Sequence, residues 1–530
     1  MVNDILYYTS VIKKKNTYRK MNRELFSFFL IKVKKEPFFF LLLLLIIFIA
    51  LFLRFYNYEN RVSVIADNSR DVQVAKYAAD FLKIPQIGQF SSAGPFFYGP
   101  WYYWFLEVIN FLPFGFLTSW YAISCIYLLF LYLLYRLGSE IGGKWMGLIA
   151  LLYGSVSPAQ IDSSLSVWNP TVVPILVIVN LLILISFFKN TNFVKVFFLG
   201  FVAGLSWTIH FQSILTFTVL LVSFFALKRK VLIYLKHLIF IILGFIFSIS
   251  PMIFFDFRHY WHNFQSIVIY MLIDQYAIWF PNSWKIYVFN YWPNAWAQII
   301  GGNLFVVWLL ITLVFIFSLL NVRKYKINKM FYVIFTTFIL EYILFRYFRV
   351  ERYQYYFLFA HPSVLVISAW TSNQLINRNK YLGIVFVFIV TFFSIRQDLI
   401  EINLPHSTNI AKLKGVKNVI YNNFPDETFD IYGCSSNASI VSHPIALMMY
   451  YENRNSLNGR KIGVCEFAGK IDWQDISVLN FSVEQKSWYN KSTETVYVST
   501  VEWWKAEPIT KGEGNFWKFI FTNVVDLLNN

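Results

Sequence analysis

The sequence predicts a polytopic α-helical membrane protein with about eleven transmembrane helices, followed by an extracytoplasmic α/β domain. Three observations support this fold class. Of the 530 residues, 57% are hydrophobic and 14% are charged. Apolar runs such as residues 37–53 and 238–255 have about the length that a membrane-spanning helix needs. After residue 396 the composition becomes polar, and short β-rich runs alternate with helix-like segments, which is typical of a small soluble α/β domain.

The basic residues set the orientation. They lie in the amino-terminal tail and then in every second connection between apolar runs, at Arg136 with Lys144, Lys189 with Lys195, residues 228–230, residues 323–329, and Arg378 with Lys380. Lys and Arg mark the cytoplasmic side of membrane proteins, so the amino terminus is expected in the cytoplasm. The net charge of +17 therefore reflects topology and contact with anionic lipid, and not binding to nucleic acid.

This alternation divides the chain into regions. Residues 1–36 form a cytoplasmic basic tail, and residues 37–396 form the transmembrane domain. The first apolar run is too long for a cleavable signal and is expected to remain as the first helix. Because the number of spans is odd, residues 397–530 are expected outside the cytoplasm, on an integral plasma membrane protein. The spans are predicted at residues 37–55, 117–136, 145–158, 171–188, 194–210, 212–227, 232–255, 297–320, 330–347, 356–373 and 380–396.

The first outer loop runs from about residue 56 to residue 116. Its last part, residues 101–116, is apolar and aromatic but contains Glu107 and Pro113, so it is expected to lie along the membrane surface. In the carboxyl-terminal domain, Cys434 and Cys465 are equally well explained as a disulfide or as two free thiols.

Two acidic sites stand at the outer membrane edge. Asp67, Arg70 and Asp71 follow the first span, and Asp162 is the one charged residue of the turn between the third and fourth spans. A solvated helix start and an ordinary turn are the simpler explanations when each site is taken alone. Taken together, two outer loops that each carry an acid predict carboxylates that face each other, and ionisable groups at a membrane are candidates for function.

Arginines in later outer connections break the charge rule. Arg258, Arg346, Arg349 and Arg352 lie on the predicted outer side among aromatic residues that include Tyr353. An anionic ligand explains them, because the planar guanidinium suits phosphate; anchoring to lipid headgroups is the alternative explanation. His259 and His262 have a spacing that only weakly suggests a metal site. His210, with Gln212 at another outer turn, is either a cavity-lining residue or a satisfied buried histidine.

The order of these motifs resembles the GT-C superfamily of membrane glycosyltransferases, and in particular the protein mannosyltransferase and aminoarabinose transferase group with its RgtA/B/C/D-like relatives. The resemblance covers about residues 37–372. It consists of the first outer loop that opens on an acid, the stretch GPFFYGPWYYW at residues 94–104, the SP…WNP turn at residues 157–170, and the RYQYY cluster at residues 352–356.

The resemblance implies residue roles. The essential acid of the family's first outer loop corresponds to Asp67, although Asn68 replaces the glutamate that usually follows, and Asp71 is the second choice. The family's second acid corresponds to Asp162. The expected phosphate-binding residues are Arg258, Arg349, Arg352 and Tyr353, and the expected substrate cavity contains Arg70, Tyr98, Trp168, Asn169 and His210.

The implied activity is transfer of a hexosyl or pentosyl group, with inversion, from a polyprenyl-phosphate sugar to a glycan, lipid or protein acceptor outside the cytoplasm. A carboxylate would deprotonate the acceptor hydroxyl, and arginine or a divalent cation would stabilise the departing phosphate. The rival interpretation is a transporter or flippase of lipid-linked sugars, which should show inverted repeats and charge near the membrane midplane; neither pattern is visible. A non-catalytic scaffold or sensor is the third interpretation.

Overall fold

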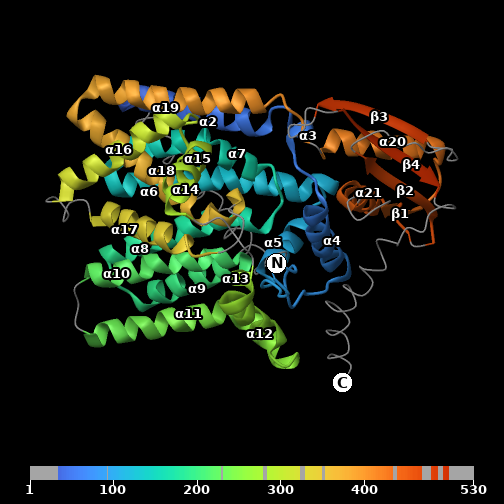
Figure 1. Ribbon diagram of the computed structural model, residues 1–530, viewed down its shortest axis with the longest axis horizontal. Helices are drawn as coiled ribbons and strands as arrows, with labels where there is room; N and C mark the ends of the chain where they lie inside the picture. Colours follow the sequence, from blue (N-terminus) through green and yellow to red (C-terminus); the bar gives the residue numbers. More distant parts are fainter. Residues whose placement is uncertain are drawn as a thin grey trace, which may run out of the picture. The chain divides into compact units, whose positions relative to one another are not determined.

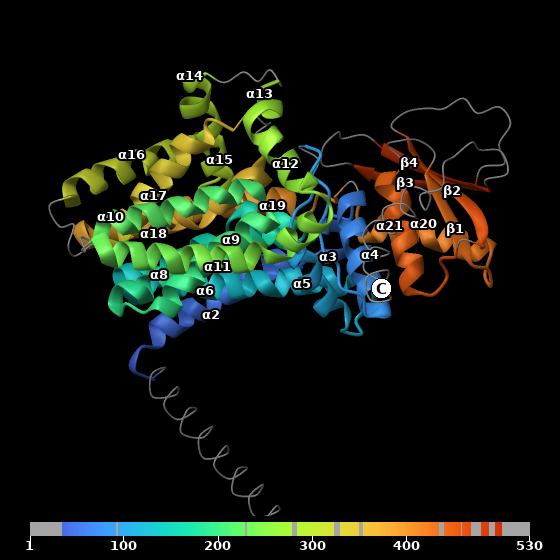
Figure 2. The ribbon, with the colours of Figure 1, turned by 90° about the horizontal axis from the view of Figure 1, so that it is seen from below.

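A computed structural model gives the architecture of the chain (Figures 1 and 2). It describes residues 34–91, 94–227, 231–277, 283–322, 329–348, 353–406, 408–433, 439–456, 458–467, 479–486 and 493–500. The chain divides into two compact units, Met1–Phe52 and Leu53–Asn530. The first unit holds most of α2 (Pro37–Phe55), a helix with a uniformly apolar sequence.

Six helical segments within the described residues are long and apolar enough to cross a membrane. They are Pro37–Phe55, Gly115–Ser155, Asn169–Lys189, Leu235–Arg258, Leu304–Asn321 and Lys380–Glu401. The other predicted spans coincide with shorter or more polar helices, which are α9 (Phe193–Ile209), α10 (Thr218–Leu227), α17 (Lys329–Phe345) and α18 (His361–Arg378). The protein is therefore mostly helical with several candidate spans, and the count of eleven spans stays a prediction.

The second and third predicted spans lie in one helical run, α6 (Thr118–Ser155). Gly142 and Gly143 interrupt its helical geometry, and Gly143 has φ +83°. Only glycine adopts this conformation at low cost, so the pair marks the connection that the charge pattern predicts between residues 136 and 145. From here the chain continues through α7 (Pro158–Ser164) and the 3₁₀ turn Asn169–Val172 into α8 (Val173–Lys189).

Helices α8, α9 and α11 (Val231–Arg258) pack side by side, as both ribbon views show. The contact between α9 and α11 is close because glycines lie on it. A Cβ added at Gly200 would stand 2.0 Å from the carbonyl oxygen of Ile241, and one added at Gly244 would stand 2.0 Å from that of Phe197. Small residues let two apolar helices approach in this way inside a membrane.

The segment between α11 and α16 is more broken than its sequence suggests. It contains α12 (His262–Ile269), α13 (Gln275–Ala277), α14 (Trp284–Ile286) and α15 (Trp292–Ile299). The predicted span at residues 297–320 begins later, with α16 (Leu304–Asn321). Gly301 and Gly302, at φ +97° and +55°, end the preceding helix and redirect the chain.

The first outer loop folds into α3 (Tyr58–Arg61), α4 (Ala66–Phe81), the paired segments 88–91 and 94–99, here called the hairpin over residues 88–99, and α5 (Trp101–Asn110). The predicted surface helix is thus shorter than residues 101–116, and α6 follows it after a turn. Indole NH groups of α5 bond to the surrounding chain: Trp101 donates to the Ser248 carbonyl at 2.6 Å and Trp104 to that of Pro85 at 2.8 Å.

The carboxyl-terminal part begins after α19 (Lys380–Glu401). It contains α20 (Ile410–Asn423), β1 (Phe429–Gly433), α21 (Ser439–Tyr451), β2 (Arg460–Phe467), β3 (Leu479–Lys486) and β4 (Thr493–Thr500). The strand order is β1-β2-β4-β3, with β1 parallel to β2 and the other two pairs antiparallel. The extracytoplasmic α/β domain as a whole stays a prediction. Cys434, one of the two cysteines of the predicted pair, lies outside the described residues.

Candidate active site

Backbone pairing brings the two acidic loops together. Ser63 forms an isolated bridge with Ser166, and its NH donates to the carbonyl of Leu165 at 3.3 Å. The Asn68 amide donates to the Ser166 hydroxyl at 3.2 Å. These contacts hold the start of α4, and with it Asp67, beside the turn that carries Trp168 and Asn169.

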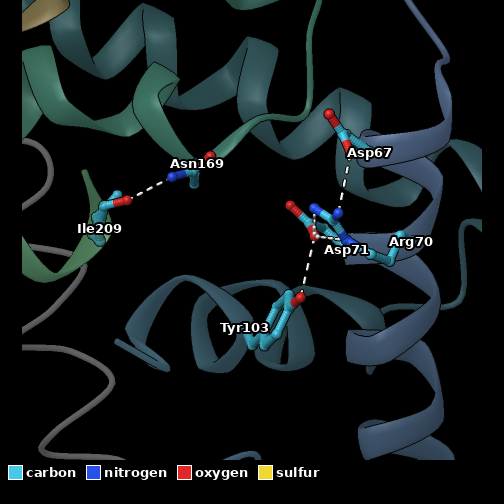
Figure 3. Close-up of polar contacts among 6 residues, drawn as sticks. All are labelled: Asp67, Arg70, Asp71, Tyr103, Asn169 and Ile209. Carbon is cyan, nitrogen blue, oxygen red and sulfur yellow. Dashed lines mark hydrogen bonds and ion pairs between the residues drawn. The ribbon is translucent and has the colours of Figure 1, made fainter. Parts of the chain in front are cut away.

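Four side chains of the first outer loop form a network (Figure 3). Arg70 donates to the Oδ1 of Asp67 at 3.0 Å, and its Nε and Nη2 donate to the Oδ1 of Asp71 at 3.0 and 2.9 Å. The Tyr103 hydroxyl donates to the same Asp71 oxygen at 3.2 Å. Since α4 is helical, Asp67 and Asp71 lie one turn apart on one face, and Arg70 joins them.

The two carboxylates have different surroundings. The Asp67 side chain is 49% exposed, whereas that of Asp71 is fully buried. Burial raises the pKa of Asp71 to about 6, against the opposing effects of Arg70 and the Tyr103 hydrogen bond. The Oδ2 of Asp71 makes no hydrogen bond within the described residues. Asp71 is therefore fully buried and bonded to Arg70.

The hairpin over residues 88–99 forms a second wall. Gly88 and Ser91 donate to the carbonyls of Tyr98 and Phe96, and Gly99 donates to Thr208 at the end of α9. A Cβ at Gly88 would lie 2.2 Å from the Gly99 carbonyl oxygen, so the two strands meet only because residue 88 has no side chain. From the other side, Asn263 of α12 bonds to the NH of Phe97 at 2.7 Å.

Aromatic rings complete the enclosure. The Tyr98 ring is nearly parallel to that of His210, at 8° and a centroid distance of 6.1 Å. The Tyr356 ring lies against His210, and the ring centroids of Tyr355 and Trp168 are 4.4 Å apart. Nearby, Asn169 donates its side-chain amide to the Ile209 carbonyl at 2.5 Å, which ties the turn before α8 to the end of α9 (Figure 3).

These elements enclose a pocket of about 450 Å³, here called the Asp67 pocket. Six residues of the sequence prediction line it: Asp67, Arg70, Tyr98, Trp168, Asn169 and His210. Further lining residues that were not among the predicted site residues include Gln89, Tyr355 and Tyr356. The two tyrosines belong to the aromatic cluster from which only Tyr353 was chosen, while nothing in the sequence marks Gln89. Gln89 is 3% exposed, and neither amide atom of its side chain has a hydrogen-bond partner in the described part of the chain.

Other predicted site residues lie elsewhere. Arg258 is exposed at the end of α11 and does not line the Asp67 pocket. Tyr353 is 48% exposed and stacks on Tyr355 at the rim. Arg349 and Arg352 lie outside the described residues. Asp162 does not face Asp67 as expected, because the helix α7 directs it into a separate pocket.

A divalent cation does not fit a protein-ligated site here. Among the residues that the structure describes, no three His, Cys, Asp or Glu side chains lie close enough to hold a metal ion. His259 stacks on Phe255 and its Nδ1 contacts the Phe255 carbonyl, so its surroundings favour packing over ligation.

The carboxyl-terminal part reaches this region through α21, which packs against α4. The Tyr450 hydroxyl donates to Asp80 at 3.2 Å, and the ammonium group of Lys76 lies 5.4 Å from the centre of the Tyr451 ring. Burial, reinforced by the charge of Arg70, lowers the pKa of His443 on α21 to about 4. The electrostatic influence of Arg70 thus extends to α21.

Comparison with known proteins identifies similar folds only. No family model matches the chain, and no curated protein matches its sequence. Among solved structures, apo ArnT from Cupriavidus metallidurans is similar with a TM-score of 0.55 and 10% identity, over 86% of this chain and 97% of ArnT. ArnT bound to undecaprenyl phosphate is similar with a TM-score of 0.53 and 8% identity, over 87% of this chain and 98% of ArnT.

A second group of similar structures comes from Archaeoglobus fulgidus. The oligosaccharyltransferase AglB, in complex with an inhibitory peptide and a dolichol-phosphate, gives a TM-score of 0.51 and 10% identity over 82% of this chain and 70% of AglB. At such identities the likeness concerns the fold, so the reaction has to be argued from the pocket.

Proposed function

From the premise that this chain has the fold of the GT-C membrane glycosyltransferases, we propose that it transfers a sugar from a polyprenyl-phosphate donor to an acceptor outside the cytoplasm. The observation that carries the proposal is a half-exposed carboxylate, Asp67, in a pocket walled by aromatic and polar side chains. ArnT, which has this fold, was solved with undecaprenyl phosphate, and this supports a lipid phosphate as the carrier.

Asp67 is the proposed general base. Arg70 holds one of its oxygens, and the other makes no hydrogen bond within the described residues. That oxygen would take the proton of an acceptor hydroxyl. The hydroxyl oxygen then attacks the anomeric carbon, the bond from that carbon to the phosphate oxygen breaks, and polyprenyl phosphate leaves with the bonding electrons. A single displacement of this kind inverts the anomeric centre. Base catalysis by a placed carboxylate typically contributes ~10²–10⁴-fold.

Arg70 and Asp71 are proposed positioning residues. Asp71 receives two hydrogen bonds from Arg70 and one from Tyr103, so the guanidinium is fixed on its buried side and presents Nη1 to Asp67. A fixed partner restricts Asp67 to one rotamer over the pocket. A catalytic group that is already positioned lowers the entropic cost of reaching the transition state. Arg70 also offsets the charge of two adjacent carboxylates.

The departing phosphate requires positive charge that Arg70, already paired with two acids, does not supply. Arg349 and Arg352 remain the proposed source. Arg352 directly precedes Tyr353 in the sequence, and Tyr355 and Tyr356 line the pocket. Guanidinium groups beside aromatic cover suit a phosphate at the lipid surface.

The sugar itself would be recognised by Gln89 and the rings of the wall. An amide that is almost fully buried without a partner costs roughly 1–3 kcal/mol, and a sugar hydroxyl would remove that cost. The rings of Trp168 and Tyr355 supply the apolar surface that a ligand pocket requires.

The test is a donor panel given to the purified full chain in liposomes. We expect release of polyprenyl phosphate from one or more undecaprenyl-phosphate sugars and no consumption of nucleotide sugars, measured by mass spectrometry of the lipid. Use of nucleotide sugars alone would contradict the proposal. Movement of intact lipid-linked sugar across the bilayer without release would instead support a flippase.

A further inference from the structure

A second pocket, of about 420 Å³, lies apart from the Asp67 pocket and is here called the Asp398 pocket. Its charged lining comes from three separate regions: Arg61 of α3, Asp162 of α7, and Asp398, Glu401 and His406 at and after the end of α19. The proposed transfer reaction uses none of these residues as described above.

Three carboxylates face one guanidinium and one imidazole, so the pocket is acidic. The guanidinium does not neutralise them by contact, because Arg61 donates to the backbone carbonyls of Leu53 at 2.7 Å and Tyr56 at 3.2 Å and pairs with no carboxylate in the described residues. The nearest partner of Glu401 is a neutral amide, that of Gln397 at 3.2 Å.

Among the carboxylates of the Asp398 pocket, Asp398 indicates the charge of the ligand most directly. It is 3% exposed, it lines the pocket, and its Oδ2 has no hydrogen-bond partner within the described residues. A buried carboxylate oxygen without a hydrogen-bond partner is costly. Arg54 and Arg61 act on Asp398 electrostatically, but both donate to backbone carbonyls, so a further cation in the pocket would stabilise this carboxylate. Asp162, across the pocket on α7, is exposed to the same space.

The shape of the site selects an organic cation. Within the described residues the carboxylates are not gathered closely enough for a metal ion, whose oxygen ligands stand at about 2–2.6 Å. The pocket also has apolar lining from Pro158, Leu165 and Leu404. Separated carboxylates with apolar surface between them suit an ammonium group attached to a carbon skeleton.

The two pockets share their dividing walls. The segment from α7 to the following turn gives Leu165 to the Asp398 pocket and Trp168 to the Asp67 pocket. The 3₁₀ segment Gln354–Ala360 gives Gln354 to the former and Tyr355 to the latter. A molecule bound in the Asp398 pocket is therefore next to the site where the sugar would be transferred.

We infer that the Asp398 pocket binds an acceptor that carries a primary amine, with Asp398 and Asp162 as the groups that receive its ammonium. The role of this ligand as acceptor rests on the proposed transfer reaction, whereas the binding of its ammonium group is argued from the pocket alone. The acceptor class is accordingly an amine-bearing glycan or headgroup.

The experiment uses the full chain in nanodiscs and two separate measurements. Saturation-transfer NMR measures binding of glucosamine, with N-acetylglucosamine as the uncharged probe, and native mass spectrometry measures binding of undecaprenyl phosphate. We expect glucosamine to bind and N-acetylglucosamine to bind at least ~10-fold more weakly. Asp398→Asn and Asp162→Asn should each weaken the binding of glucosamine at least ~10-fold without changing the binding of undecaprenyl phosphate. Glu107→Gln is the matched control, because Glu107 is a carboxylate that lines neither pocket.

The outcomes separate the two proposals. Equal binding of both sugars, or unchanged glucosamine binding in Asp162→Asn and in folded Asp398→Asn, overturns the inference. Displacement of glucosamine by micromolar Ca²⁺ or Mg²⁺ also overturns it, in favour of a metal site. Failure of undecaprenyl phosphate to bind while glucosamine still binds counts against the proposed transfer reaction and leaves the ammonium site intact.

Discussion

At the scale of single residues, the contrast between Asp67 and Asp71 shows how one helix places two identical side chains in different environments. Asp67 begins α4 at the pocket, while Asp71, one turn later, is enclosed by α5 and bonded to Arg70 and Tyr103. Removal of Arg70 would leave the Asp71 carboxylate buried and uncompensated, which typically costs 3–5 kcal/mol. This environment is the basis for the proposed role of Asp71, which is to hold Arg70.

The pKa of Asp71, raised to about 6 by burial, predicts a pH dependence. Above pH 6 the carboxylate is ionised and holds Arg70; below it, protonation weakens both hydrogen bonds and leaves Arg70 to bind Asp67 alone. Donor turnover should therefore fall on the acid side with an apparent pKa near 6. In Tyr103→Phe, Asp71 loses a hydrogen-bond donor that lowers its pKa. The acid-side fall in donor turnover should therefore shift to higher pH in this variant. A pH–rate profile that is identical in the two proteins would refute this assignment.

Arg352→Lys retains the charge but loses the planar fork of donors. We expect the KM for the lipid-linked donor to rise about tenfold with kcat less affected, because phosphate contact is the function assigned to Arg352. Arg258→Lys is the matched control, since Arg258 is exposed and outside both pockets. An unchanged KM in Arg352→Lys would return this arginine to the role of a headgroup anchor.

At the scale of elements, the hairpin over residues 88–99 carries Gln89 and Tyr98 into the Asp67 pocket. Gly88→Ala would place a methyl group 2.2 Å from the Gly99 carbonyl oxygen, so the strands must separate. We expect donor affinity to fall at least tenfold while the protein still inserts in the membrane. Gly459→Ala, whose methyl would stand 2.6 Å from the Phe429 NH in the sheet region, is the control and should leave donor affinity unchanged.

The elements also show how far the sequence could predict the structure. Long apolar runs and alternating basic connections indicate most helices, because these signals depend on local composition. The first-loop acids, Trp168, Asn169 and His210 were found because polar residues at a membrane edge are unusual. Gln89 was missed because its importance depends on burial by a hairpin, and the separation of Asp162 from Asp67 depends on the direction of α7, which spacing does not encode.

At the scale of the whole molecule, contact between α21 and α4 connects the carboxyl-terminal part to the first outer loop. Tyr450 bonds to Asp80, Tyr451 bonds to Asn110, and Lys414 pairs with Glu59 at 2.6 Å. These contacts require both parts to lie on one side of the membrane. The predicted topology places both parts on the extracytoplasmic side, and that orientation stays a prediction.

The topology is testable with reporter fusions. Alkaline phosphatase joined after residue 406 should be active, and green fluorescent protein joined to the amino terminus should fluoresce, because the basic segments are expected in the cytoplasm. Fusion of each reporter at the opposite position supplies the control. Fluorescence from a fusion after residue 406 would place the tail in the cytoplasm and reverse every outer-side assignment.

Asp67 is proposed to remove the acceptor proton during transfer from a polyprenyl-phosphate sugar. Asp67→Asn keeps the size of the side chain and its ability to accept from Arg70, while it removes the basic oxygen. The decisive measurement is single-turnover transfer by this variant beside Glu107→Gln, with undecaprenyl phosphate binding as the check on folding. Undecaprenyl phosphate binding should be normal in both variants, and the transfer rate should be at least ~10²-fold lower in Asp67→Asn alone. Transfer at the wild-type rate by Asp67→Asn would contradict the proposed role.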